Sequence, residues 1–385
     1  MTHSNKIFKK TRPWLWVGLL LFLPLLLLEL WTGKWRSLPL DKSLFNYVSY
    51  TNSRNMDPQI AYFEARQDWE FVAIGSSEVR WGIDPNQIEA AIASQSINTH
   101  GFNLGLDGFN ISLYKAILPG LNLPQRLPKL RVVLIGINLI ETQRLLPENF
   151  DQGFSCDGIL SRSVLTSAFA KDYGLYHLCN TLAWPTPLVA AIEKVSATIR
   201  YRQALRTLLL GYSRDSDIIH VASNGIEQFA NGFFAHASIQ AQPEEANIDQ
   251  FLAEKKESPQ KFKPLPQEDW PALLANNGFY NQVASYFHAR KVLPVFFALP
   301  TNPLMIDTMN RRPDYERNSQ LFQAWAIAQS QPTIFIDQGI QDDYNGLLDY
   351  SDYRHLSQSG ALKFSRELGE QLSRNFEVIK ALSNA

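Results

Sequence analysis

Cysteine is scarce in this chain, and so are the motifs that bind metals or nucleotides. The 385 residues include only two cysteines, Cys156 and Cys179, which do not have the spacing of a metal-binding pair. The sequence contains no His-Glu-x-x-His or Cys/His zinc pattern and no P-loop, and Gly101, Gly105 and Gly108 do not make a dinucleotide-binding fingerprint. We therefore expect a function that uses no metal and no cofactor.

An excess of charge is also missing. The chain has 36 Lys and Arg residues against 37 Asp and Glu residues, and its formal net charge is -1. A protein whose main partner is nucleic acid needs a basic excess to neutralise phosphates, so nucleic acid is not the expected partner. Internal repeats and low-complexity tracts are absent from the sequence too. The hydrophobic content of 45% is that of an ordinary globular protein with a full core.

One long apolar run is present near the N-terminus. It extends from Trp14 to Trp31 with Glu29 as its one charged residue, which is about the length that spans a bilayer as a helix. Basic residues precede the run, which favours a cytoplasmic N-terminus, and tryptophans stand at both ends, where interfacial aromatics belong. The alternative is a cleaved signal peptide, but the run is long for one and no small-x-small cleavage site follows it. We predict a cytoplasmic tail at 1–13, a transmembrane anchor at 14–32 and a lead-in segment at 33–68.

No later segment is apolar enough to span a membrane. Residues 69–385 are therefore predicted to form one soluble body outside the cytoplasm, in the periplasm or at the cell surface. A disulfide between Cys156 and Cys179 is permitted there, and two buried free thiols are the equal alternative.

Strand and helix patterns alternate through most of residues 69–385. Short apolar runs predict buried strands at Glu70–Gly75, Ile97–Leu104, Leu130–Ile137, Val292–Leu299 and Thr333–Ile336. Helices are predicted at Pro85–Ala93, Ile111–Leu118 and Ser359–Phe376. This alternation indicates an α/β fold with a parallel sheet of about five strands, covered by helices on both faces.

The alternation breaks between residues 139 and 283. This insertion has helical patterns at Ser161–Lys171 and Pro187–Leu210 and carries no chemical motif. It is expected to be a cap over the site, a partner surface or a small subdomain.

Chemically competent residues follow the predicted strands, where parallel sheets collect functional groups. Ser77 comes directly after the first strand, on a tight turn that opens into a helix, which is a common place for a nucleophile. After the last strand, His355 is a candidate base and Asp352, three residues earlier, can orient its ring. The backbone N–H groups of Ser77 and Gly108 and the amide of Asn138 are candidate donors to an oxyanion. The pattern predicts acyl transfer through a serine nucleophile.

Each of these residues has an ordinary structural alternative. Ser76 is favoured as the N-cap of the following helix, a role that Ser77 could fill as well. A glycine at 108 can simply serve a turn, and Asn138 can cap a helix. The copy Asp217-Ile-Ile-His220 shows that the Asp-x-x-His spacing also arises by chance, and it lies in the insertion rather than after a core strand.

Together the blocks resemble the SGNH hydrolases, also called the GDSL esterase/lipase superfamily. The family's Gly-Asp-Ser block corresponds to Gly75-Ser76-Ser77, and its Asn-x4-Gly block to Asn103 through Gly108. Its Gly-x-Asn-Asp block corresponds to Gly136-Ile137-Asn138-Leu139, and its Asp-x-x-His block to Asp352 through His355. Ser76 and Leu139 replace two aspartates, neither of which is catalytic in the family. The four blocks occur in family order over roughly residues 70–370, apart from the insertion.

The resemblance implies a three-layer, flavodoxin-like α/β/α fold in which Ser77, Asp352 and His355 are catalytic and Ser77, Gly108 and Asn138 form the oxyanion hole. The Gly-Ser-Ser-Glu sequence with an N-terminal anchor looks like the membrane-anchored branch, which includes alginate-acetylation and teichoic-acid D-alanylation proteins. That branch implies acyl transfer from an acyl donor onto an envelope polysaccharide, often beside a multi-span membrane O-acyltransferase. The alternatives are a membrane-anchored esterase, deacetylase or lipase, and a non-catalytic scaffold on the same fold.

Two residues just after the nucleophile, Arg80 and Trp81, are candidates for binding substrate. Arg80 could hold an anionic group of the substrate, whereas the favoured alternative is an ion pair with Glu78 or Asp84.

Overall fold

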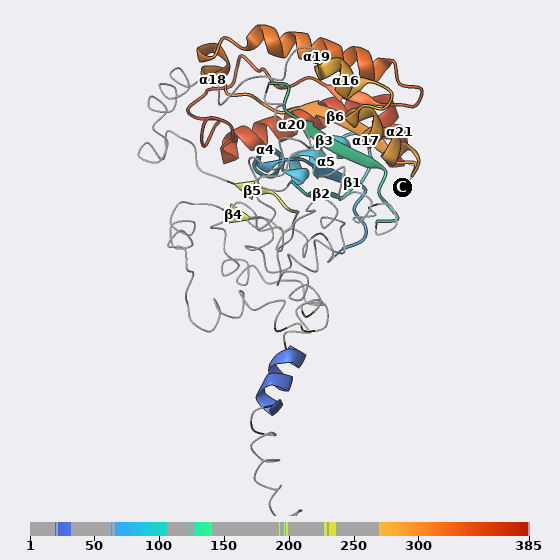
Figure 1. The fold of residues 1–385 in the computed structure, drawn as a ribbon, viewed down its shortest axis with the longest axis vertical. Helices are drawn as coiled ribbons and strands as arrows, with labels where there is room; N and C mark the ends of the chain where they lie inside the picture. Colours follow the sequence, from blue (N-terminus) through green and yellow to red (C-terminus); the bar gives the residue numbers. More distant parts are fainter. Residues whose placement is uncertain are drawn as a thin grey trace, which may run out of the picture.

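A parallel sheet forms the centre of the part of the chain that the structure describes (Figure 1). The computed structural model describes residues 66–105, 127–140, 231–235 and 269–383, with a few short pieces elsewhere, among them residues 22–31. The five strands are β1 (Phe71–Ile74), β2 (Gly101–Asn103), β3 (Val132–Ile137), β6 (Leu293–Ala298) and β7 (Ile334–Ile336). They lie in the order β2-β1-β3-β6-β7, and all neighbouring pairs are parallel.

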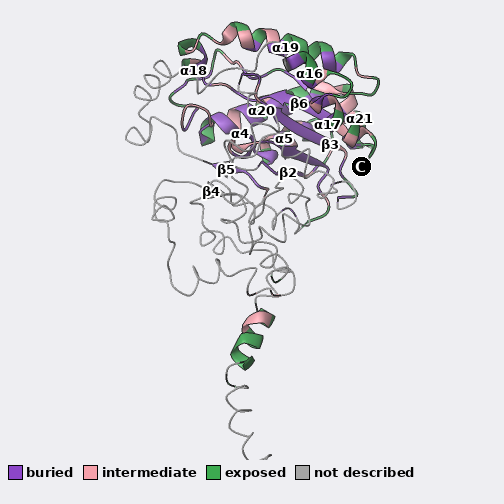
Figure 2. Cartoon of the chain, viewed as in Figure 1, coloured by how far each residue is buried: buried purple, intermediate pink, exposed green. Residues whose placement is uncertain are grey.

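The strands are apolar on both faces because helices cover both faces of the sheet. All residues of β1 and β3 are buried. Successive residues of a strand point to opposite faces, so Val72 and Ile74 pack in one core cluster while Phe71 and Ala73 pack in the other. The burial colouring shows the buried sheet between helices with exposed outer faces (Figure 2). The predicted α/β class with a covered parallel sheet of five strands is confirmed.

Two helical layers supply the rest of the core. The first cluster contains buried residues of α16 (Asp269–Leu274), α17 (Phe279–His288), α18 (Pro303–Thr308) and α19 (Arg312–Ile327). The second contains residues of α4 (Ser77–Gly82), α5 (Pro85–Ala93), α20 (Gln358–Arg374) and α21 (Phe376–Ser383). A small antiparallel pair, β4 (Glu227–Gln228) and β5 (Phe234–Ala235), lies outside the main sheet.

Most predicted elements match the structure closely. The helix at Pro85–Ala93 is found with the predicted bounds, and the four strands other than β2 differ by at most two residues at either end. The strand predicted at Ile97–Leu104 is wrong in its first half, because only Gly101–Asn103 pairs with β1. The predicted C-terminal helix matches α20 within two residues at either end, and a further helix that was not predicted, α21, follows its C-cap Asn375.

The insertion is only partly described. α16 and α17 contribute buried aromatics such as Trp270 and Tyr280 to the first cluster, so the core resumes by residue 269, within the span predicted as insertion. The helix predicted at Ile111–Leu118, most of the helical patterns at 161–210, both cysteines and the Asp217–His220 copy lie outside the described residues.

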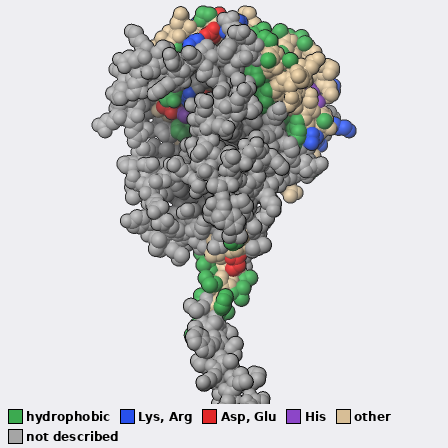
Figure 3. Space-filling model, in the orientation of Figure 1, with side chains coloured by type: hydrophobic (Ala, Val, Ile, Leu, Met, Phe, Trp, Pro, Cys, Tyr) green, Lys and Arg blue, Asp and Glu red, His purple; other side chains and the backbone are tan. Residues whose placement is uncertain are grey.

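Residues 22–31 are helical, and their apolar side chains are largely exposed, including Phe22 at 72% and Leu30 at 59%. The space-filling view shows these apolar side chains at the surface (Figure 3). Among the residues that the structure describes, no helix has both the length and the apolar character needed to cross a bilayer. The predicted anchor at 14–32 lies only in part within those residues.

Candidate active site

The turn after β1 places two adjacent serines in different roles. Ser76 is the N-cap of α4, and its Oγ accepts a hydrogen bond from the Glu78 N–H. Ser77 is the first residue of that helix, so Ser76 is the cap and the Ser77 hydroxyl points elsewhere. Gly75 makes the tight turn possible, because it has φ +156° and a Cβ there would lie 2.3 Å from Val79 Cγ2.

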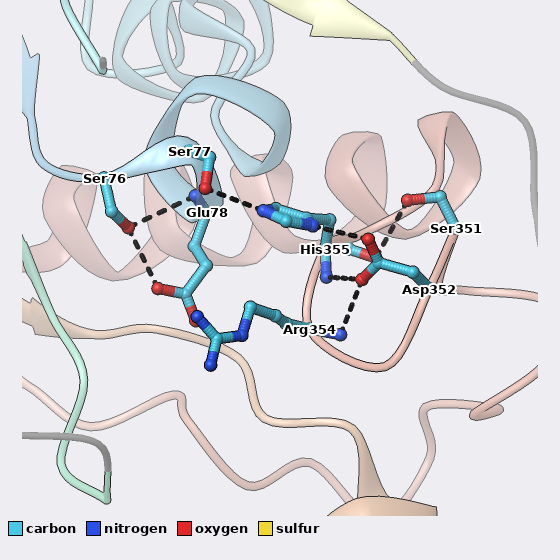
Figure 4. A network of polar contacts seen from close by, with 7 residues as sticks. All are labelled: Ser76, Ser77, Glu78, Ser351, Asp352, Arg354 and His355. Carbon is cyan, nitrogen blue, oxygen red and sulfur yellow. Dashed lines mark hydrogen bonds and ion pairs between the residues drawn. The ribbon is translucent and has the colours of Figure 1, made fainter. Parts of the chain in front are cut away.

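Ser77, His355 and Asp352 form a continuous hydrogen-bonded relay (Figure 4). The Ser77 Oγ lies 2.7 Å from His355 Nε2 although the two residues are 278 positions apart. On the other side of the ring, His355 Nδ1 lies 2.6 Å from Asp352 Oδ2. With Nδ1 protonated toward the carboxylate, Nε2 is the acceptor for the serine proton, as a nucleophile–base–carboxylate triad requires.

The Asp-x-x-His segment builds its own rigid turn. Asp352 Oδ1 accepts hydrogen bonds from the backbone N–H groups of Arg354 and His355, both at 2.7 Å. An antiparallel bridge between Tyr350 and Leu356 closes the loop just before α20. One carboxylate oxygen therefore fixes the loop while the other holds the imidazole.

The charges of the relay shift both of its pKa values. Burial disfavours ionisation of Asp352, but the neighbouring His355 and the hydrogen bonds to its oxygens outweigh burial and lower the pKa of Asp352 to about 2. Burial also opposes a charge on His355, yet the Asp352 carboxylate, with a smaller contribution from Glu78, raises the pKa of the imidazole. The site thus favours the ion pair that exists after the histidine takes a proton.

Trp81 contacts this relay, and Arg80 is a buried residue of the same helix. The Trp81 ring packs against the His355 ring with centroids 4.3 Å apart and an interplanar angle of 35°. Trp81 lies four residues after Ser77, so the two side chains are on the same side of α4. This spacing is the sequence signal that could have predicted the contact between Trp81 and His355. Arg80 is buried at 2% exposure.

Asn138 follows β3, beside β1 at the carboxyl edge of the sheet. Its Nδ2 donates to Glu78 Oε1 at 3.0 Å, and its Oδ1 accepts from the Ile140 N–H at 2.9 Å. Glu78 lies directly after the nucleophile, so the structure brings Asn138 to the nucleophile turn through this side chain. The involvement of Glu78 was not predicted from the sequence. Gly108, the other candidate oxyanion donor, lies outside the described residues.

Asn103, the first residue of the second block, holds α4, the helix that begins at Ser77, in place. Its buried Nδ2 donates to the carbonyl oxygens of Val79, Arg80 and Ile83 at 2.8, 3.2 and 2.6 Å. Its Oδ1 accepts from the Gly105 N–H at 2.8 Å. Asn103 therefore ties the carboxyl end of β2 to the last turn of α4.

A short segment of the insertion also contacts this helix. The carbonyl oxygen of Asn231 accepts from the Asn103 N–H at 2.8 Å, and Asn231 Nδ2 donates to Asp84 Oδ1 at 3.1 Å. Phe233 is buried in the same cluster as Val79. This segment of the insertion is thus bonded to β2 and to Asp84, the N-cap of α5.

No protein-family model matches the chain, and no curated protein matches its sequence. In the described part of the chain, no group of three or more His, Cys, Asp or Glu side chains is arranged to hold a metal ion. The chemistry that this arrangement can support is proton abstraction from a serine hydroxyl by a carboxylate-oriented histidine.

Proposed function

We propose that this protein is an SGNH-type serine acyltransferase or acyl-relay protein that acts on a cell-envelope or extracellular polysaccharide. The observation that carries the proposal is the Ser77–His355–Asp352 relay, with distances of 2.7 and 2.6 Å, past the ends of the strands. Numbered along the chain, the five strands lie in the order 2-1-3-4-5, which supports the finer assignment to a flavodoxin-like sheet. The serine follows β1 and Asn138 follows β3, the two strands at the switch point where such sheets bind ligands.

The first half-reaction forms an acyl-serine. His355 Nε2 takes the Ser77 proton as Oγ attacks the carbonyl carbon of an ester or thioester donor, and the imidazolium is stabilised by Asp352. The carbonyl oxygen becomes an oxyanion, for which the Ser77 N–H and the Asn138 amide are proposed donors, with Gly108 as the third. Ser77 begins α4, so its N–H has no acceptor within the helix. Collapse of the oxyanion breaks the bond to the leaving group, which receives the proton from His355.

The second half-reaction transfers the acyl group. A sugar hydroxyl gives its proton to His355 Nε2 and attacks the acyl carbon, after which the bond to Ser77 Oγ breaks and the serine regains its proton. The same steps with water as acceptor make the protein an esterase, so the acceptor decides between the two activities. We further propose that residues 14–32 anchor the chain in a membrane with residues 69–385 outside the cytoplasm, where a multi-span O-acyltransferase is a candidate partner.

Labelling with a fluorophosphonate probe tests the proposal on the full-length protein. We expect covalent labelling of the wild type at Ser77, located by mass spectrometry, and none in Ser77→Ala. The matched control is Ser76→Ala, which removes the adjacent cap hydroxyl and should retain labelling at Ser77. Unlabelled wild type, or labelling that persists in Ser77→Ala, would overturn the assignment. Product analysis with and without a polysaccharide acceptor then separates transfer from hydrolysis.

A further inference from the structure

Glu78 connects the nucleophile turn to the end of β3. Its Oε1 accepts from Asn138 Nδ2 at 3.0 Å, and its Oε2 accepts from Ser76 Oγ at 2.9 Å. Figure 4 shows the carboxylate extending from the first turn of α4, away from the ring of His355. A single side chain therefore engages residues after two neighbouring strands of the sheet.

The amide of Asn138 is held at both ends. Its Oδ1 accepts from the Ile140 N–H at 2.9 Å while its Nδ2 donates to Glu78. These two bonds fix which end of the amide carries the donors, since only the NH₂ end can donate to a carboxylate. Without Glu78, Asn138 would lose one of the contacts that fix its χ2 angle.

The carboxylate also contributes to the charge around His355. The groups that act on the imidazole are Asp352 at Nδ1, Glu78 from α4 and Arg354 from its own loop. The two carboxylates raise the pKa of His355 and the guanidinium lowers it, while burial opposes the imidazolium. The uncharged Trp81 ring packs against the same imidazole.

We propose that Glu78 is a positioning residue that orients the Asn138 amide as an oxyanion donor. The inference rests on the proposed acyl chemistry and adds a residue that the family blocks do not assign. Glu78 also adds a negative charge to the surroundings of His355, and substitution separates this charge effect from the positioning effect. Glu78→Gln keeps an acceptor oxygen for Asn138 but removes the charge, and Glu78→Ala removes both.

A double-mutant cycle tests the positioning effect with an activated acetyl ester and the full-length protein. Asn138→Ala should lose about 10²–10³ in kcat as an oxyanion donor does. Glu78→Ala should lose about 10- to 100-fold in kcat with KM little changed, because it misplaces that donor rather than deleting it. If Glu78 acts through Asn138, adding Glu78→Ala to Asn138→Ala should cost less than about threefold. The control is Glu367→Gln, whose carboxylate bonds to Tyr344 rather than to a residue of the relay and should leave kcat unchanged.

The charge effect is tested by pH dependence. The general base must be neutral, and the acid limb of kcat/KM reports the pKa of His355 in the free enzyme. Removing a negative charge lowers that pKa, so Glu78→Gln should move the acid limb to lower pH, and an NMR titration of the His355 ring should show the same shift. This titration measures the pKa of His355 in Glu78→Gln without any turnover. It therefore tests the charge effect even if Glu78→Ala does not fold.

The outcomes distinguish this inference from the proposed function. A wild type that neither reacts with the probe nor hydrolyses the ester overturns both. A wild type that reacts at Ser77, with losses from Glu78→Ala and Asn138→Ala that multiply independently, overturns the positioning role alone. A His355 pKa in Glu78→Gln equal to that of the wild type overturns the charge role.

Discussion

Removing the Asn103 amide should both destabilise the fold and disturb α4, the helix that begins at Ser77. The side chain is fully buried and makes four hydrogen bonds, three to carbonyl oxygens at 2.8, 3.2 and 2.6 Å and one from the Gly105 N–H at 2.8 Å. The bond to the Val79 carbonyl matters least, because that carbonyl also accepts from the Ile83 N–H. The other three bonds account for most of the stability lost in Asn103→Ala. At about 1 kcal/mol for each net hydrogen bond, the loss in free energy of unfolding is about 3 kcal/mol.

The isosteric Asn103→Asp variant sharpens this prediction. It replaces the donor nitrogen with an acceptor oxygen that faces three carbonyl oxygens, so it should destabilise at least as strongly as Asn103→Ala at pH 7. Protonation of the new carboxyl restores one donor, and its pKa in the folded state is raised by this environment. The instability of Asn103→Asp should therefore lessen as the pH falls.

Urea unfolding of the full-length protein, followed by tryptophan fluorescence, measures the change. Asn281→Ala is the control, since this residue makes one side-chain bond near the start of α17 and should cost about 1 kcal/mol or less. Probe labelling of Ser77 should also slow in Asn103→Ala, because α4 begins at that serine. A loss below about 1 kcal/mol with normal labelling would refute the view that Asn103 holds α4 in place.

Two further predictions concern the relay and the turn before it. The pKa of Asp352 is about 2 in the folded chain against about 3.9 when unfolded, so the carboxylate stabilises the fold above about pH 4 and this contribution is lost as the pH falls through 2. Because the Asp352 side chain is 33% exposed, Asp352→Asn should lower the free energy of unfolding by only on the order of 1 kcal/mol at pH 7. In unfolding experiments the difference from wild type should shrink below pH 4. A difference that stays constant with pH would contradict the assignment. Gly75→Ala places a Cβ 2.3 Å from Val79 Cγ2 at φ +156° and should cost about 1–3 kcal/mol in the same assay. Adding Val79→Ala should cost less in that background than alone, and simple additivity would argue against the clash.

The candidate site combines residues that the sequence could and could not reveal. The Asp-x-x-His segment could be predicted from the sequence because it forms a local turn, in which Asp352 accepts hydrogen bonds from the backbone N–H groups of Arg354 and His355. The choice of Ser76 as the cap and of Ser77 as the hydroxyl that bonds His355 also depends on local geometry. Two contacts could not be predicted from the sequence: that of Glu78 with Asn138 and that of Asn103 with α4. They join elements that are separated along the chain.

The sequence by itself determined most strands of the main sheet and the helices α5 and α20. Short apolar runs specified strands buried on both faces, and their alternation with helices specified a parallel sheet, because hydrophobic periodicity is a local property of the chain. Only the tertiary structure decided which side chains meet. The order β2-β1-β3-β6-β7 brings Ser77 within 2.7 Å of a histidine 278 residues away, and that juxtaposition depends on packing across the whole core rather than on any local pattern.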